Sequence, residues 1–306
     1  MKRIISVIVI LIFGFSLQIK AQEFIPLYPS GVPDPAKSNE KADAYAGAEA
    51  PTLQVFLPEK GKETKTAVIV FPGGAYMGLA YQEEGSNIGQ EFAKRGVAAF
   101  VVKYRLPIGY RVPTSKAPMS GDRYLMPLED AQQAIKEVRM NAAKWNVDTG
   151  KIGIIGFSAG GHVASSLGTH FTKSYIPNKE RTNLRPDFMI LVYPVISFAD
   201  SLTHWESRNR LIGPDISPEN IAYYSNELHV TKNTPPAFIT HGLDDEAVKS
   251  INSLYFAAAL QQHHVPVKLF LYTHGAHGYG IYNKGAMVQW IDDCIDWINQ
   301  NRWKLR

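Results

Sequence analysis

The sequence predicts an α/β protein with a mostly parallel central sheet and helices on both faces of that sheet. Short apolar runs rich in β-branched residues alternate along the chain with stretches long enough for helices. Most of these runs lack the polar alternation of a half-exposed strand, which indicates strands covered on both faces. The alternation is interrupted at residues 196–235, which carry no clear strand. We therefore predict one domain over residues 53–306, with residues 196–235 as a small cap insertion over the carboxyl ends of the strands.

Residues 1–21 have the features of a cleaved signal peptide. Lys2 and Arg3 precede an apolar run at residues 4–17, and the residues just before Gln22 resemble a signal-peptidase site. A transmembrane anchor is the alternative, but the run is shorter than the roughly 20 residues that cross a bilayer. We expect an exported protein, periplasmic or secreted, without stable membrane insertion.

The chain without this leader is close to electrically neutral. The whole sequence carries a net charge of +4, with 32 basic and 28 acidic residues. Without Lys2, Arg3 and Lys20, the 32 basic residues become 29 and the net charge falls to +1. Such a chain, which also lacks a basic run, has no electrostatic basis for binding nucleic acid or membrane surfaces. We expect neither as a partner.

The strands of the predicted sheet follow an irregular N-terminal segment. Residues 22–52 are rich in proline and alanine and have little periodicity, and we interpret them as an N-terminal arm. Beyond the arm, apolar runs predict strands at residues 53–58, 66–71, 97–104, 152–155, 187–193, 237–240 and 267–272.

Helical stretches alternate with these strands. They are predicted at residues 84–95, 127–145, 250–264 and 284–300, and directly after residue 158. Gly96 ends the first helix, and Pro127 can open the second after a loop rich in proline and glycine. The last helix carries Cys294, the single cysteine of the chain, on the same face as Trp290 and Ile298. One cysteine cannot form an intramolecular disulfide, and we predict that Cys294 is a buried core thiol.

The segment "GFSAG" at residues 156–160 places Ser158 where a buried strand is followed directly by a helix. A Gly-x-Ser-x-Gly pattern alone is weak, because composition produces it in about one chain in ten of this length. Its position between strand and helix is the one that a nucleophile elbow requires. In such a turn a side chain at residue 156 or 160 would collide with neighbouring chain, and glycine avoids the collision. Ser158 is therefore the candidate nucleophile.

A serine nucleophile needs a base to accept its proton and an acid to orient that base. Two later strands are followed by loops that offer both, "HGLDDEAV" and "THGAHGYG", in the chain order Ser, acid, His. Within the first loop Asp244 and Asp245 are alternative acids, and within the second His274 and His277 are alternative bases. His162 and His241 are expected to pack in the core or to support the site, and the remaining histidines are expected to lie on the surface or in loops.

Acyl transfer also requires N–H donors for the oxyanion. The segment "PGGAY" at residues 72–76 follows an early strand, and its small residues let backbone N–H groups approach a carbonyl oxygen. Gly74 or Ala75, together with Ala159 after the nucleophile, are the candidate donors of an oxyanion hole.

These motifs resemble the α/β-hydrolase superfamily. The similarity runs from about residue 71 to residue 280 and includes the segments "FPGGAYMGLAYQEEG", "MPLEDAQQAIKEVR", "GFSAGGHVA", "NTPPAFITHGLDDEAV" and "GAHGYG". Within the superfamily the chain is most similar to the secreted bacterial esterase/lipase-like group that includes acetyl xylan esterases. The predicted domain at residues 53–306 is accordingly expected to have the α/β-hydrolase fold.

The resemblance implies a choice between the alternative site residues. In the pattern His-Gly-x-x-Asp-x-x-Val the acid is Asp245, and in Gly-x-His-Gly-aromatic-Gly the base is His277. Ala75 stands where relatives often have a third glycine, but it retains its N–H group. The aspartate of "PLEDA", Asp130, is expected to be structural. The mechanism implied is two-step acyl transfer from Ser158, without a metal ion or an organic cofactor.

We therefore expect an exported serine carboxylic-ester hydrolase whose substrates are acylated carbohydrates, above all acetylated xylan-type polysaccharide, or small esters. A serine peptidase of the same fold is an alternative, but no additional domain or acidic grip for a substrate amine is evident. The second alternative is a non-catalytic carbohydrate-binding protein of the same fold, although such proteins generally lose a triad residue. A glycosidase is disfavoured because it would rely on two carboxylates across a sugar.

Overall fold

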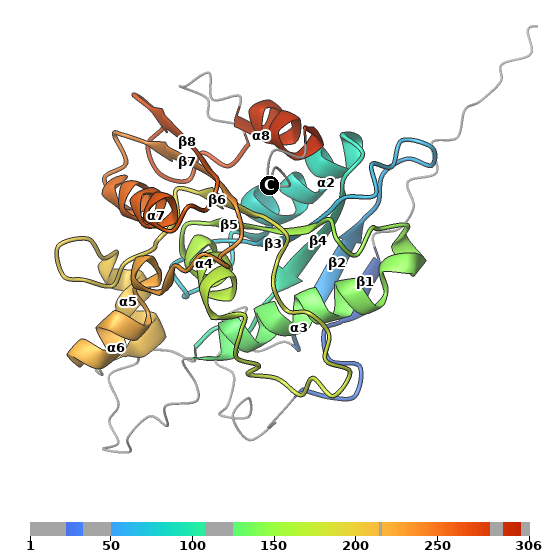
Figure 1. Ribbon diagram of the computed structural model, residues 1–306, viewed down its shortest axis with the longest axis horizontal. Coiled ribbons are helices and arrows are strands. Elements are labelled where there is room, and N and C mark those ends of the chain that lie inside the picture. Colours follow the sequence, from blue (N-terminus) through green and yellow to red (C-terminus); the bar gives the residue numbers. More distant parts are fainter. Residues whose placement is uncertain (1–22, 33–49, 108–124, 214–215, 282–289, 301–306) are drawn as a thin grey trace, which may run out of the picture.

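The computed structural model describes residues 23–32, 50–107, 125–213, 216–281 and 290–300 (Figure 1). The predicted signal peptide at residues 1–21 lies outside these residues, as does most of the predicted loop at 106–126. Within the described residues, no helix has both the length and the apolar character needed to cross a membrane.

One eight-stranded sheet organises the described residues, with the strand order β1-β2-β4-β3-β5-β6-β7-β8. The strands are β1 (Glu23–Pro26), β2 (Thr52–Phe56), β3 (Ala67–Phe71), β4 (Ala98–Lys103), β5 (Ile152–Phe157), β6 (Met189–Val192), β7 (Ala237–Gly242) and β8 (Val267–Tyr272). The pairs β1–β2 and β2–β4 are antiparallel, whereas all other pairs are parallel. The prediction of a mostly parallel sheet is confirmed.

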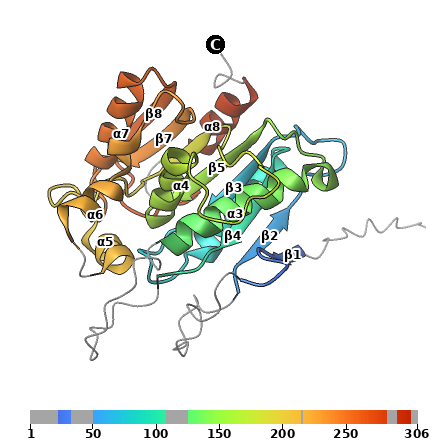
Figure 2. The same cartoon turned by 60° about the horizontal axis from the view of Figure 1, so that its bottom comes forward.

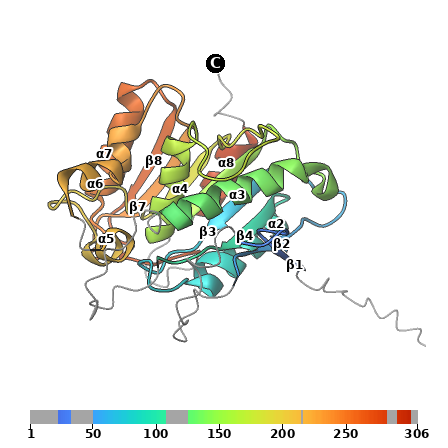
Figure 3. The same ribbon diagram turned by 90° about the horizontal axis from the view of Figure 1, so that it is seen from below.

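Helices cover both faces of the sheet, as predicted (Figures 2 and 3). The helices concerned are α2 (Asn87–Lys94), α3 (Met126–Met140), α4 (Ala159–His170), α7 (Ile251–Gln262) and α8 (Trp290–Asn299). Side chains of α3, α4 and α7 join one apolar core, and those of α2 and α8 join a second core. Successive residues of β3 alternate between the two cores, with Ile69 in the first and Val70 in the second. Strands buried on both faces explain the continuous apolar runs.

The segment between β6 and β7, which we predicted as a cap insertion, is helical. It contains α5 (Trp205–Ile212), α6 (Pro218–Tyr223) and the 3₁₀ turn η4 (Asn226–His229), and no strand occurs in its described part. These helices lie together at one end of the molecule, close to α7 (Figures 1 and 3). The buried Asn226 amide donates to the Ser165 hydroxyl at 2.8 Å, which fastens the segment to α4.

The predicted helix at residues 84–95 begins differently from our expectation. A short π-helix, η1 (Tyr81–Ser86), precedes the regular helix α2. Gly96 follows the helix with φ +82°, and a Cβ there would lie 2.4 Å from the Lys62 carbonyl oxygen, so only glycine fits. The π-helical turn carries Glu84, which is 5% exposed and lies beside the candidate oxyanion loop.

The N-terminal arm contributes a strand that the sequence analysis did not predict. Its residues 23–26 form β1, which pairs with β2 at the edge of the sheet. Tyr28, just beyond β1, donates its hydroxyl to Asp130 at 2.7 Å. Asp130 is fully buried on α3 and also accepts from the backbone N–H and the guanidinium of Arg105, each at 2.7 Å. The expected structural role of Asp130 is confirmed, because it joins the arm, α3 and the end of β4.

The last helix also agrees with the sequence analysis. Cys294 is fully buried on α8 together with Trp290 and Ile298. Burial raises the pKa of its thiol well above the usual value, which keeps the thiol protonated. The prediction of a buried core thiol is confirmed.

Candidate active site

Ser158 occupies a strained turn between β5 and α4. Its backbone has φ 50° and ψ −119°, a conformation that L-residues rarely adopt. A Cβ on Gly156 would lie 2.2 Å from the Gly160 carbonyl oxygen, and one on Gly160 would lie 2.1 Å from the Phe71 carbonyl oxygen. Both glycines are therefore required for steric reasons, as the sequence predicted. The turn holds the Ser158 side chain at the carboxyl end of β5 and the amino end of α4.

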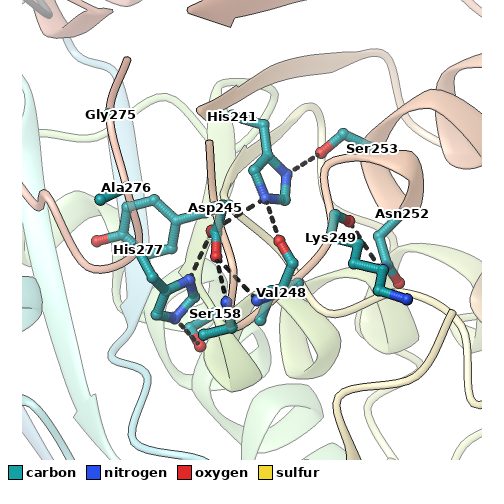
Figure 4. A network of polar contacts seen from close by, with 12 residues as sticks. Ser158, His241, Asp245, Val248, Lys249, Asn252, Ser253, Gly275, Ala276 and His277 are labelled. Carbon is teal, nitrogen blue, oxygen red and sulfur yellow. Dashed lines mark hydrogen bonds and ion pairs between the residues drawn. The ribbon is translucent and has the colours of Figure 1, made fainter. Parts of the chain in front are cut away.

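A chain of hydrogen bonds connects Ser158 to His277 and Asp245 (Figure 4). The Ser158 hydroxyl lies 2.9 Å from His277 Nε2, and His277 Nδ1 lies 2.7 Å from Asp245 Oδ2. Because an ionised carboxylate only accepts hydrogen bonds, Nδ1 carries the proton and Nε2 accepts from Ser158. The three residues follow the carboxyl ends of β5, β7 and β8, which parallel pairing brings to one edge of the sheet.

The Asp245 carboxylate is held by several donors. Its Oδ1 accepts from the N–H groups of Ala247 and Val248, at 3.0 and 2.8 Å. His241 Nε2 lies 3.2 Å from Oδ2 and 2.8 Å from the Val248 carbonyl oxygen. Burial alone would raise the pKa of Asp245, but hydrogen bonds from His241 and His277 outweigh it and hold the pKa well below the usual value. Asp245 is therefore ionised at neutral pH.

The structure separates the alternatives that the sequence left open. Asp244 is partly exposed and accepts from the N–H groups of Gly275 and Ala276, both at 2.8 Å. Its carboxylate thus fastens the loop that carries His277. The His274 side chain is 78% exposed and its Nδ1 lies 3.5 Å from Asp244. Asp245 and His277 are brought to Ser158, whereas Asp244 and His274 are not.

The candidate oxyanion loop, residues 72–76, lies against the nucleophile. A Cβ on Gly73 would come within 2.9 Å of the Ser158 Cβ. Gly74, Ala75 and Tyr76 follow with φ values of 131°, 53° and 58°. Within the described part of the chain, the N–H groups of Gly74 and Ala75 donate to no protein acceptor. The loop therefore packs against Ser158 through Gly73, and the N–H groups of Gly74 and Ala75 remain candidate oxyanion donors.

His162 and Tyr76 connect this loop to the helix of the nucleophile. His162 Nε2 lies 2.8 Å from the Tyr224 carbonyl oxygen, so Nε2 carries the proton. Nδ1 then accepts from the Tyr76 hydroxyl at 2.7 Å. Burial lowers the pKa of His162 to about 4, which keeps the ring neutral. The sequence placed His162 near the site but gave no sign of its partner, because Tyr76 is 86 positions away.

The fold and this site define an α/β-hydrolase with a serine, a histidine and an aspartate in hydrogen-bond contact. Residues 53–260 match the BD-FAE family. The chain therefore belongs to the BD-FAE family, within the α/β-hydrolase esterases.

Individual relatives are consistent with this membership. The chain is 34% identical over 244 residues to an acetylxylan esterase from Xylanibacter ruminicola, covering 78% of this chain and 45% of that protein. It is 37% identical over 228 residues to endo-1,4-beta-xylanase B from Butyrivibrio fibrisolvens, covering 74% of this chain and 34% of that protein. The chain thus spans between a third and a half of the length of these relatives.

A solved structure covers almost the whole chain. The crystal structure of an acetyl ester-xyloside bifunctional hydrolase from Caldicellulosiruptor lactoaceticus matches with a TM-score of 0.76 and 35% sequence identity. The match covers 93% of this chain and 98% of that one. The two chains therefore share one fold over most of their length.

Proposed function

We propose that this chain is a serine ester hydrolase that removes acetyl groups from xylan-type polysaccharide. The observation that carries the proposal is the hydrogen-bond chain from Ser158 through His277 to the buried Asp245. An oxyanion hole formed by the N–H groups of Gly74, Ala75 and Ala159 completes the machinery. Gly74 and Ala75 belong to the loop that packs against Ser158 through Gly73, and Ala159 is the residue after the nucleophile. A nucleophile, a base and oxyanion donors are the parts that acyl transfer requires.

The reaction has two steps. His277 Nε2 accepts the Ser158 proton while the serine oxygen attacks the ester carbonyl, and the oxyanion hole binds the negative oxygen. The tetrahedral species expels the alcohol, which takes the proton from His277, and an acyl-enzyme remains. Water then gives a proton to His277 and attacks the acyl-enzyme, which releases the acid and returns the proton to Ser158. Asp245 fixes the Nδ1–H tautomer and stabilises the protonated imidazole.

The substrate class rests on the relatives. An acetylxylan esterase and an acetyl ester-xyloside hydrolase are both similar to this chain. The xylanase name of the Butyrivibrio relative belongs to a protein of which the match covers 34%, so it assigns no glycosidase activity here. We also propose export, to the periplasm or beyond, on the basis of the predicted signal peptide at residues 1–21.

Acetate release from acetylated xylan tests the function, with Ser158→Ala measured beside the wild-type protein. We expect release by the wild type and its loss in the variant. If the wild type cleaves only a small acetyl ester, the acyl-transfer chemistry remains and the xylan substrate is wrong. If neither ester is cleaved and a fluorophosphonate does not label Ser158, the assignment as a serine hydrolase is wrong.

A further inference from the structure

A buried carboxyl group outside the proposed triad lies between the two loops that complete the site. Glu84 is 5% exposed and sits in the π-helical turn η1. π-Helical turns are rare and are frequently found at functional sites. The Glu84 carboxyl and the Ser158 Cβ lie against the same side of Gly73, where a Cβ would be 2.6 Å from Glu84 Oε2 and 2.9 Å from Ser158 Cβ.

The two carboxyl oxygens of Glu84 contact different loops. Oε2 accepts from the Gly73 N–H at 2.7 Å, next to the candidate oxyanion donors. Oε1 accepts from the Tyr193 hydroxyl at 2.8 Å. The oxygen of that hydroxyl accepts in turn from the Gly280 N–H at 2.9 Å, three residues after His277. A continuous path of hydrogen bonds therefore runs from the oxyanion loop to the loop of the histidine.

Tyr193 also contacts the histidine directly. Its ring is fully buried, and its centroid lies 5.0 Å from that of His277 in an edge-on arrangement. Tyr193 follows β6 with φ 37°, a strained conformation for a side chain of this size. The strain indicates that surrounding contacts hold the ring in place, and the Glu84 carboxyl supplies one of them.

The burial of a carboxyl group here has an energetic cost. Burial raises the pKa of Glu84, and hydrogen bonds from Tyr193 and Gly73, with the nearby His277, offset that effect only in part. A buried carboxyl destabilises the fold unless its partners compensate, and such groups are concentrated at functional sites. The position of Glu84 between two catalytic loops is consistent with such a site.

We propose that Glu84 is a positioning residue whose carboxyl fixes the oxyanion loop relative to the loop that carries His277. The proposal rests on the proposed acyl-transfer function. Glu84 makes no contact with the Ser158 hydroxyl among the hydrogen bonds of the described residues, so its effect on the reaction passes through the backbone at Gly73 and through Tyr193. A misplaced oxyanion donor lowers transition-state stabilisation more than substrate binding.

Steady-state kinetics on p-nitrophenyl acetate test the catalytic consequence. We expect Glu84→Ala to lower kcat by about 10- to 100-fold with KM within about threefold of wild type. Glu84→Gln keeps an acceptor for the Gly73 N–H and should recover part of the loss. Tyr193→Phe cuts the second half of the path and should lower kcat while leaving Glu84 in place. Glu83→Gln, one position earlier and exposed, is the matched control and should behave as wild type.

Hydrogen exchange of the folded variants tests the connection independently of activity. In Glu84→Ala the amides around Gly73 and Gly280 should both exchange faster than in wild type and in Glu83→Gln. Wild-type exchange in both loops, or a wild-type kcat in Glu84→Ala, would overturn the proposal. If the wild type cleaves no ester while the exchange result holds, the proposed function fails and the connection stands.

Discussion

Asp244 and Asp245 are neighbours with identical side chains and different surroundings. Asp245 is buried against His277 and His241, whereas Asp244 is partly exposed and binds two backbone N–H groups. The sequence offered both as the acid, because adjacent residues on a turn differ only in which way they point. Their separation depends on the three-dimensional path of the loop, and only the resemblance to a family had favoured Asp245.

The same substitution at these two positions gives a matched test. Asp245→Asn should lower kcat by about 10³- to 10⁴-fold, because the amide no longer stabilises the protonated imidazole or enforces the Nδ1–H tautomer. Asp244→Asn keeps an oxygen that can accept from Gly275 and Ala276, so its effect should stay below about tenfold. Ester hydrolysis by both variants is the measurement. Equal losses would contradict the assignment of Asp245 as the acid.

The lowered pKa of the buried His162 predicts how the stability of the protein changes with pH. Its folded pKa is about 4, and the usual value for histidine is 6.5. Between these values the unfolded chain binds a proton that the buried ring does not, so stability falls as the pH falls through this window. The loss from this one group is about 3 kcal/mol at most.

Urea unfolding at pH 7.5 and at pH 4.5 measures this effect. His162→Gln should unfold more easily at pH 7.5, because the contact with Tyr76 is changed, and should lose less stability on acidification than wild type. His263→Gln, at an exposed position, should keep the wild-type dependence on pH. If His162→Gln and wild type lose the same stability on acidification, His162 is not the group responsible.

At the scale of elements, the interior strands were predicted well because they are buried on both faces and therefore have continuous apolar sequences. The longer stretches between these strands then predicted the helices. Within the predicted strands 66–71 and 187–193, residues 67–71 and 188–192 are apolar throughout, and the structure places β3 and β6 there. β1 was missed because most of its four residues are exposed and it lies at an edge, so it leaves no apolar signature. The π-helical turn η1 was missed because its sequence also fits an ordinary helix.

For the candidate site, the sequence predicted the local motif around Ser158 but not the contacts between residues that are distant in the chain. Gly156, Ser158 and Gly160 form a local motif, and local steric demands can be read from the chain. The contacts of Glu84 with Tyr193 and of His162 with Tyr76 span 109 and 86 positions. No local pattern specifies such pairs, because each partner alone fits an ordinary core or loop position.

The close packing of the turn between β5 and α4 predicts that its glycines cannot be replaced without loss of stability. Gly160→Ala would place a Cβ 2.1 Å from the Phe71 carbonyl oxygen, a backbone atom that cannot move away alone. We expect a loss of about 1–3 kcal/mol of stability or more, together with reduced esterase activity. Gly78→Ala is the control, since a Cβ there meets nothing within 4 Å. A Gly160→Ala variant with the thermal stability of Gly78→Ala would show that the turn is less crowded than described.

At the scale of the whole molecule, the N-terminal arm is part of the fold. β1 extends the sheet, and Tyr28 reaches the fully buried Asp130 on α3, which also holds Arg105. β1 and β8 form the opposite edges of the sheet, and Figure 2 shows β1 on the side of the molecule away from α7. The arm therefore stabilises the half of the domain that does not carry Asp245 and His277.

Removal of the Tyr28 hydroxyl tests this contribution. Tyr28→Phe should lower the free energy of unfolding by about 1–2 kcal/mol, because the carboxylate of Asp130 loses one donor in a buried site. Tyr255→Phe, with a side chain 48% exposed on α7, should change stability little. Thermal unfolding followed by circular dichroism compares the two. The activity of folded Tyr28→Phe should equal that of wild type, and a selective loss of activity would contradict a purely stabilising role.

The distance in sequence between Ser158 and His277 also bears on how the protein folds. Their hydrogen bond joins residues 119 positions apart, and β6, β7 and β8 all form within that interval or at its end. Contacts of such long range appear late in folding, because the entropy of closing the loop is lost before the contact is gained. Ester hydrolysis during refolding would then follow the completion of the parallel sheet. A chain arrested before β8 has joined β7 would contain most of the secondary structure and no working nucleophile.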